Sequence, residues 1–199
     1  MPYRKHLSKD KKLKKLIARH DGFTLRRRKN VCLRLCASIM SQQLSTKVAE
    51  VIYKRFLNLF DGKNPTPQQI LSVKPETLRS IGLSNAKVSY VHNVARFAIE
   101  NGVEAKHLHK MDNEEVISYL TQIKGVGRWT AEMLLMFTLG REDVFAPDDL
   151  GIQISMQKLY NLNGSDKKKI KSKMISIAES WKPYRTYACL HLWHFKDSD

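Results

Sequence analysis

The sequence is short of cysteine and of acidic residues, and it contains no long apolar run. Its 199 residues include three cysteines and 19 acidic residues against 35 Lys or Arg, which leaves a formal net charge of +16. Three scattered cysteines cannot build a disulfide framework, so we expect buried free thiols and no metal site. Membrane spans need roughly 18 apolar residues in a row, and secretion signals need an apolar core. Neither is present in the sequence, and we expect an intracellular protein with no membrane partner.

The excess of positive charge favours a polyanionic partner, and nucleic acid is the commonest one. A basic protein without such a partner is the alternative. An RNA-binding protein has little support, because no motif for reading single strands is visible. Hydrophobic residues make up 42% of the chain, which is enough for a folded core.

The hydrophobic pattern predicts an all-α protein, because apolar residues recur at spacings of three and four and no alternating strand pattern is found. Glycine and proline separate the periodic segments. The expected helices cover about 11–17, 30–60, 67–72, 75–82, 84–101, 112–120, 128–139 and 147–162, with two more at the end of the chain.

Two glycines flank a single valine between the helices expected at 112–120 and 128–139. A short glycine turn joins two helices as a hairpin, and Gly125 and Gly127 leave the main chain open to a large partner. Backbone N–H groups at the start of the second helix can bind a phosphate without regard to base sequence. An ordinary structural turn is the alternative.

Two adjacent carboxylates, Asp148 and Asp149, open the helix expected at 147–162. One of them is expected to cap that helix. A carboxylate held rigidly near nucleic acid opposes binding, and its presence in so basic a protein favours a chemical role.

These two motifs resemble the helix-hairpin-helix DNA glycosylase superfamily, and within it the alkylated-base branch, the type II 3-methyladenine DNA glycosylases. The resemblance is carried by Gly125–Ala131 and Pro147–Leu150, together with Ile39–Ser45 and Trp181–Trp193. It covers about residues 25 to 195. It implies two helical lobes that flank a DNA-binding cleft and contain a helix-hairpin-helix motif. We expect a basic helical segment at 1–23 that packs with the second lobe, a lobe at 24–141 that contains the hairpin, and a second lobe at 142–199 that carries the catalytic residue.

The resemblance implies that Asp149 is the catalytic carboxylate and leaves Asp148 as the helix cap. Lyase-type members of the family carry a nucleophilic lysine two residues after the last glycine of the hairpin, where this sequence has Trp129. We therefore expect a monofunctional enzyme. Three cysteines also cannot hold the four-cysteine iron–sulfur cluster of several lyase-type relatives.

The remaining site predictions also come from the resemblance. Trp129 and Trp193 match positions that line the base pocket, and Tyr184 and Tyr187 are weaker candidates; for Trp193 the alternative is a plain core aromatic. Gln42 and Gln43 match the loop that enters the duplex, where Gln43 would fill the gap left by the flipped base; both could instead be solvated helix residues. The expected DNA-binding residues are Gln42, Gln43, Lys124, Gly125, Val126, Gly127, Arg128 and Thr130.

The predicted function is hydrolysis of the N-glycosidic bond of alkylated purines, of the 3-methyladenine or 7-methylguanine type, in duplex DNA during base excision repair. The alternatives are a glycosylase for another damaged or mispaired base and a non-catalytic DNA-binding protein, for which Asp149 would be dispensable. No cofactor is expected, apart from a monovalent cation that backbone carbonyls of the hairpin could hold. We expect a monomer that acts on damaged duplex DNA, in the cytoplasm or nucleoid of a bacterium or the nucleus of a eukaryote.

Overall fold

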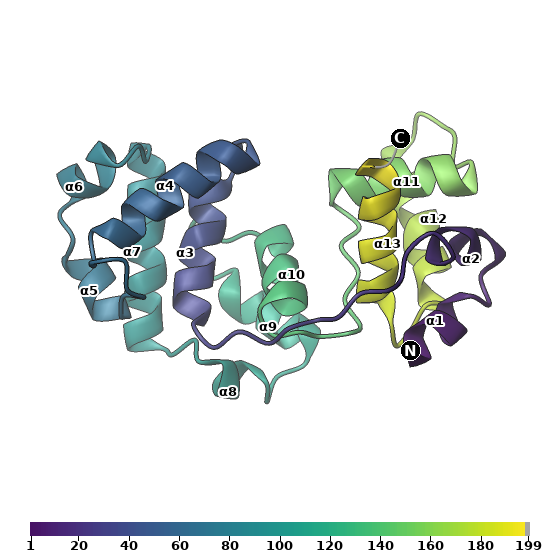
Figure 1. The fold of residues 1–199 in the computed structure, drawn as a ribbon, viewed down its shortest axis with the longest axis horizontal. Helices are drawn as coiled ribbons and strands as arrows, with labels where there is room; N and C mark the ends of the chain where they lie inside the picture. Colours follow the sequence, from purple (N-terminus) through teal and green to yellow (C-terminus); the bar gives the residue numbers. More distant parts are fainter. Residues whose placement is uncertain (198–199) are drawn as a thin grey trace. The chain divides into compact units, whose positions relative to one another are not determined.

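A computed structural model describes residues 1–197, and within this range it contains α-helices and no β-strand (Figure 1). This confirms the all-α prediction. The helices are α1 (Pro2–Leu7), α2 (Lys11–Ile17), α3 (Val31–Ser41), α4 (Thr46–Asn58), α5 (Pro67–Ser72), α6 (Pro75–Ser80), α7 (Asn85–Glu100), α8 (Ala105–Leu108), α9 (Asn113–Leu120), α10 (Arg128–Phe137), α11 (Leu150–Tyr160), α12 (Lys167–Glu179) and α13 (Arg185–Asp197). None of these helices is both long and apolar enough to cross a membrane.

The chain forms two compact units. Unit 1 joins Met1–Arg26 to the chain from Leu135 onward, and unit 2 is Arg27–Leu134. The N-terminal helices thus group with the C-terminal part, but the boundaries lie after residues 26 and 134 rather than after 23 and 141. The second boundary falls inside α10, whose last turn belongs to unit 1. Leu135, Met136 and Leu139 are buried, so this stretch is core rather than a linker.

The core of unit 2 lies along α7, which packs against α3, α5 and α6. Val88, Val91, Val94 and Ala95 of α7 are buried, and their spacing places them on one face of the helix. The side chains of Cys32 and Cys36 are buried in α3, and Cys189 is buried in unit 1; all three are core thiols outside any disulfide, as expected.

The prediction of one continuous helix over residues 30–60 is wrong, because a turn separates α3 from α4. Gln43 adopts a left-handed conformation with φ 57°, and Ser45 then caps α4 by accepting a hydrogen bond from the amide of Val48. Leu44 and Val48 continue the apolar periodicity, yet they are 37% and 46% exposed. The periodicity therefore concealed a turn that presents side chains to solvent.

Asp10 fastens the N-terminal helices to the rest of unit 1. One carboxylate oxygen caps α2 by accepting from the amides of Lys12 and Leu13, and the other accepts from the hydroxyl of Tyr160 at 2.6 Å and the indole N–H of Trp181 at 3.1 Å. Burial acts to raise the pKa of Asp10, but these hydrogen bonds to the charged form outweigh it and hold the pKa below its ordinary value of 3.8.

Replacing Asp10 with asparagine should lower the free energy of unfolding by about 1–3 kcal/mol at neutral pH, because an amide nitrogen cannot accept from Tyr160 and Trp181. A carboxyl whose pKa is depressed in the folded state stabilises the fold above its unfolded-state pKa, and this contribution is lost as pH falls through the folded-state pKa. Urea unfolding at several pH values should therefore show the two proteins converging in acid. Asp21→Asn, at an exposed position, is the control; an Asp10→Asn deficit that did not change with pH would contradict the assignment.

Candidate active site and nucleic-acid interface

Asp149 is fixed at the N-terminus of α11 in unit 1. Its Oδ1 accepts hydrogen bonds from the amide of Ile152 at 2.9 Å and from the indole N–H of Trp193 at 2.8 Å. The four residues before the acidic pair, Val144–Pro147, are all buried, so the core sets the path of the chain into this position. The carboxylate is therefore held in one orientation by a backbone donor and a side-chain donor, and both remain compatible with a negative charge.

Gly151 provides the space in which Trp193 reaches Asp149. A Cβ atom on Gly151 would lie 3.0 Å from Cδ1 of Trp193 and 3.1 Å from Oδ1 of Asp149, closer than ordinary van der Waals contacts. The ring of Phe137 lies 5.7 Å from that of Trp193, and Phe137 is 42% exposed. Trp193 is thus a half-buried member of an aromatic pair that also binds the carboxylate, rather than a plain core aromatic.

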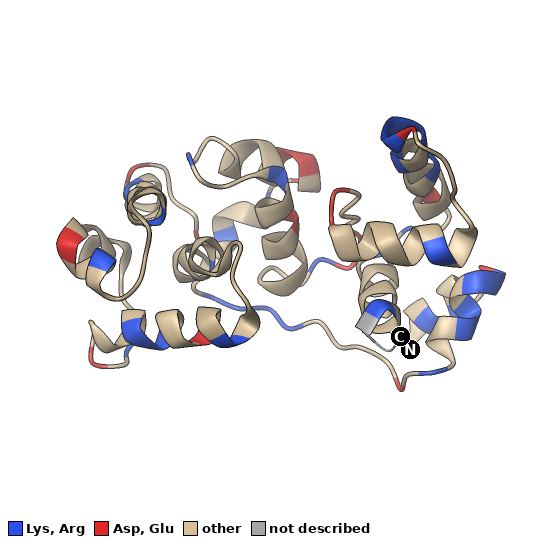
Figure 2. Ribbon diagram, turned by 90° about the horizontal axis from the view of Figure 1, so that it is seen from above, with Lys and Arg blue, Asp and Glu red and all other residues tan. Residues whose placement is uncertain are grey.

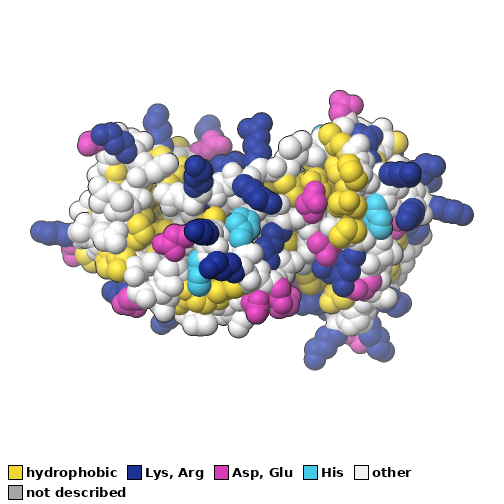
Figure 3. Space-filling view, turned by 90° about the horizontal axis from the view of Figure 1, so that it is seen from below, with side chains coloured by type: hydrophobic (Ala, Val, Ile, Leu, Met, Phe, Trp, Pro, Cys, Tyr) yellow, Lys and Arg dark blue, Asp and Glu magenta, His cyan; other side chains and the backbone are white. Residues whose placement is uncertain are grey.

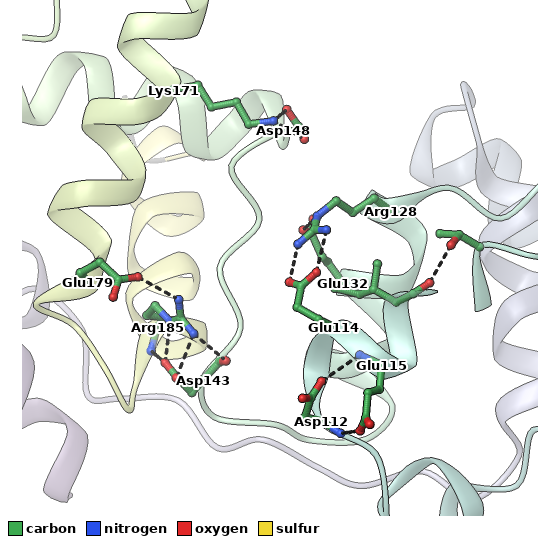
Figure 4. Close-up of polar contacts among 12 residues, drawn as sticks. Asp112, Glu114, Glu115, Arg128, Glu132, Asp143, Asp148, Lys171, Glu179 and Arg185 are labelled. Atoms are coloured by element: carbon green, nitrogen blue, oxygen red, sulfur yellow. Dashed lines mark hydrogen bonds and ion pairs between the residues drawn. The ribbon is translucent and has the colours of Figure 1, made fainter. Parts of the chain in front are cut away.

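The helix cap was assigned to the wrong member of the acidic pair. Asp149 caps α11, whereas Asp148 is exposed and its two carboxylate oxygens accept from Nζ of Lys171 at 2.6 and 2.7 Å (Figure 4). The reason is geometric, because a cap must directly precede the first helical residue, and that residue is Leu150. The predicted catalytic residue and the actual cap are therefore the same side chain.

In unit 2, the two glycines of the hairpin have different reasons to be glycine. Gly125 has φ 108°, and a Cβ atom there would lie 2.3 Å from Cγ of Tyr90 in α7, so the turn packs directly on that ring. A Cβ atom on Gly127 would meet nothing within 4 Å. Since the fold itself does not need a glycine at this exposed position, the lack of a side chain there suits close approach by an external partner.

The residues next to the glycines differ in how far their side chains are exposed to a DNA partner. Lys124 is exposed, whereas Val126 is buried at 5% exposure. Trp129 is 40% exposed directly after the glycine turn, as a residue that stacks on a base would be. Thr130 is only 3% exposed, so the structure does not support its predicted DNA contact. Thr130 lies in the first turn of α10 and is buried there.

Arg128 acts as a brace between the two helices of the hairpin. Its guanidinium donates to both carboxylate oxygens of Glu114 in α9, at 2.6 and 2.9 Å, and to the buried Glu132 at 3.0 Å (Figure 4). Bonding to Glu114 and the charges of both carboxylates raise the pKa of Arg128, against an opposing effect of burial. In this structure the side chain of Arg128 therefore has a structural role, and its contact with DNA stays a prediction.

The turn between α3 and α4, residues Gln42–Leu44, lies beside the hairpin. Nε2 of Gln42 donates to the carbonyl of Gly125 at 3.4 Å. Gln43 is exposed, and so is Leu44, although Leu44 continues the apolar periodicity of the helix predicted over 30–60. The sequence did not reveal this turn, because no glycine in the stretch marks the left-handed conformation that Gln43 adopts.

Tyr184 directly precedes α13, and Tyr187 lies in its first turn. Tyr187 stacks on Tyr3 with 3.9 Å between ring centroids and donates its hydroxyl to Glu142. Trp193 is six residues further along, or about 9 Å along the helix axis. The two tyrosines thus line a different part of unit 1 from Asp149, where Tyr3 and Glu142 are their neighbours.

Basic side chains are present on both units. Blue segments for Lys and Arg outnumber red acidic segments along the ribbon in Figure 2, and on the face drawn in Figure 3 many of these side chains project into solvent. Such a distribution supports binding to a polyanion through its backbone charges.

Comparison with known proteins gives a consistent family and fold. The family described as HhH-GPD superfamily base excision DNA repair protein matches residues 36–180. The DNA-3-methyladenine glycosylase 1 of Schizosaccharomyces pombe is 36% identical over 187 residues, which cover 92% of this chain and 80% of that protein.

Solved structures agree with the sequence match. The crystal structure of a DNA-3-methyladenine glycosidase from Bacillus halodurans has a TM-score of 0.86 and 36% identity, covering 98% of this chain and 89% of the other. The 3-methyladenine DNA glycosylase Mag1 of S. pombe, in complex with abasic DNA, has a TM-score of 0.87 and 32% identity, covering 99% and 97%.

Proposed function

Because this chain belongs to the HhH-GPD superfamily of base excision DNA repair proteins, we propose that it is a DNA-3-methyladenine glycosylase acting on alkylated purines in duplex DNA. The observation that carries the mechanism is the fixed carboxylate of Asp149 at the N-terminus of α11, held by Ile152 and Trp193. The relative Mag1, solved on abasic DNA, supports DNA as the partner. The monomeric state and the cellular compartment stay predictions.

The chemistry needs little more than a placed negative charge. Alkylation at a ring nitrogen makes the purine cationic, so its glycosidic bond is already weakened. As that bond breaks, positive charge develops on the sugar, and the Asp149 carboxylate stabilises it while orienting or deprotonating the attacking water. The exposed indole of Trp129 can stack on a cationic base that has left the helix, where the attraction of a cation to a ring face adds to stacking.

The hairpin would bind the phosphate backbone of DNA. Amide N–H groups in the first turn of α10 have no acceptor within that helix, and the helix dipole favours an anion there. The bare Gly127 lets a phosphate approach these groups. The Gln42–Leu44 turn beside the hairpin would then enter the duplex, with Gln43 and the exposed Leu44 as the side chains that fill the gap.

The proposed hydrolysis needs no cofactor. A monovalent cation on the hairpin carbonyls stays a prediction, and it would have to share two of them, because the carbonyls of Lys124 and Gly125 already accept from Asn93 and Gln42.

The proposal is tested by incubating the protein with duplexes that carry one modified base each and identifying the released base by chromatography. We expect free 3-methyladenine and 7-methylguanine, and much slower release of uracil, oxidised guanine or mispaired adenine. Faster release of one of these other bases would assign the chain to a different substrate. Release of no base at all by a protein that still binds DNA would favour the non-catalytic alternative.

Borohydride should fail to trap the protein on its substrate. A lyase forms a Schiff base through an amine nucleophile, and the position two residues after Gly127 holds Trp129 rather than lysine. The expected result is free protein on a denaturing gel under conditions in which a bifunctional glycosylase gives a covalent adduct. An adduct formed by this protein would show that another amine attacks the sugar, and the enzyme would not be monofunctional.

A further inference from the structure

Lys87 makes an unusual use of a lysine in a DNA-binding protein, because its ammonium group is directed at the protein's own backbone. Nζ donates to the carbonyl of Met40 at 2.9 Å and to that of Gln42 at 2.7 Å. These carbonyls lie at the C-terminal end of α3, where helix carbonyls lack intrahelical N–H donors and the dipole favours a cation. Lys87 therefore caps α3 from the neighbouring helix α7.

The capped segment is the strained Gln42–Leu44 turn. Gln43 has φ 57°, a conformation that residues other than glycine rarely adopt and that its surroundings must impose. The carbonyl of Gln42, one of the two that Lys87 binds, directly precedes this residue. Fixing that carbonyl fixes the peptide plane leading into the strained residue, and hence the direction of the side chains of Gln43 and Leu44.

The same face of α7 also supports the hairpin. Lys87, Tyr90 and Asn93 are spaced three apart, which places them along one side of the helix. The ring of Tyr90 fills the space beside Gly125, and Nδ2 of Asn93 donates to the carbonyl of Lys124 at 3.2 Å. One helix face thus holds both backbone segments that would contact DNA, and all of these contacts lie within unit 2.

We propose that Lys87 is a positioning residue for base flipping, which holds the Gln42–Leu44 turn in the conformation that enters the duplex and in register with the hairpin. This rests on the proposed function. The ammonium group acts through the two carbonyls and not through a phosphate. Burial lowers the pKa of Lys87 below its ordinary value of 10.5, because it withdraws the ammonium group from solvent.

Lys87→Met in the full chain tests the proposal, with Lys47→Met as the matched control, since Lys47 is an exposed lysine at the start of α4. Three quantities are measured: the salt dependence of affinity for duplex DNA, the fluorescence of a base analogue beside the lesion, which reports flipping, and single-turnover release of 3-methyladenine. Removing a lysine that binds a DNA phosphate reduces the slope of log K against log salt by about one.

For Lys87→Met we expect the wild-type salt slope, but a roughly tenfold or larger loss in flipping fluorescence and in the single-turnover rate, since flipping precedes the chemistry. Lys47→Met should release base at the wild-type rate. Replacing Lys87 with cysteine and alkylating it with bromoethylamine restores an amine at the same reach and should restore flipping; the three native cysteines are buried. If Lys87→Met fails to fold, Lys87→Arg keeps a charged donor and should flip the base.

A salt slope reduced by about one, with base release falling only in proportion to binding, would show that Lys87 binds a phosphate and overturn the proposal. Unchanged flipping in a folded Lys87→Met protein would also overturn it. Because fluorescence reports flipping without bond cleavage, a wild-type protein that flips the base but releases none would disprove the proposed function while leaving the role of Lys87 measurable.

Discussion

Replacing Asp149 with asparagine should reduce single-turnover release of 3-methyladenine by roughly 10²- to 10⁴-fold, the range typical for loss of one catalytic charge or proton-transfer group. The asparagine Oδ1 can still accept from the amide of Ile152 and the indole of Trp193, so the cap of α11 and the position of the side chain are kept. Only the negative charge is removed. DNA affinity should therefore be retained or rise slightly, since a carboxylate beside DNA opposes binding.

Asp148→Asn is the matched control for this substitution. It changes the adjacent carboxylate in the same way but affects only an exposed ion pair with Lys171, a type of interaction that contributes about 0–1 kcal/mol. Its base release should stay within roughly threefold of wild type, as expected for an exposed surface substitution. Equal losses in both variants, or full activity of Asp149→Asn, would remove Asp149 from the mechanism.

Alanine at each hairpin glycine should separate folding from DNA binding. Gly127→Ala should leave the free energy of unfolding within about 0.5 kcal/mol of wild type, because its methyl group enters open space at an ordinary φ. It should nevertheless weaken binding to an abasic duplex roughly tenfold or more, because the methyl group stands where a phosphate would meet the backbone. Denaturant unfolding and a fluorescence titration with duplex DNA provide the two measurements.

Gly125→Ala is the contrasting variant. Its Cβ atom would lie 2.3 Å from the Tyr90 ring at φ 108°, so it should destabilise the protein by more than about 2 kcal/mol. Wild-type DNA affinity in Gly127→Ala would show that the backbone of the hairpin does not approach the duplex.

The helices and the hairpin could be predicted from sequence because their signals are local. Asp112 and Glu115 form a capping box at the start of α9, and Ser84 caps α7, so residue types at these helix starts mark them in the sequence. The turn at Gln43 could not be predicted, because the neighbouring Gln42 is held by Lys87 and Gly125, which lie far away in the chain. Apolar residues that continue at helical spacing across it concealed the break.

The candidate site shows the same division between local and tertiary signals. The Asp148–Asp149 pair marked the right place, but which of the two caps α11 depends on where that helix begins. Their position beside the glycines led to a predicted DNA contact for Arg128 and Thr130. In the structure, Arg128 pairs with Glu114 and Glu132, and Thr130 is buried. Adjacency to a motif does not settle exposure. The hydrogen bond from Trp193 to Asp149 joins residues 44 apart in sequence, and no pattern announces it.

The central claim is that the Asp149 carboxylate stabilises positive charge on the sugar of a flipped nucleotide. The most direct test compares affinity for duplexes that contain either a pyrrolidine abasic analogue, whose ring nitrogen is cationic, or a neutral tetrahydrofuran analogue. The wild-type protein should bind the cationic analogue at least roughly 10²-fold more tightly, as transition-state mimics do, and Asp149→Asn should lose that preference while it still binds the neutral duplex. Equal affinity of the wild-type protein for the two duplexes would contradict the claim.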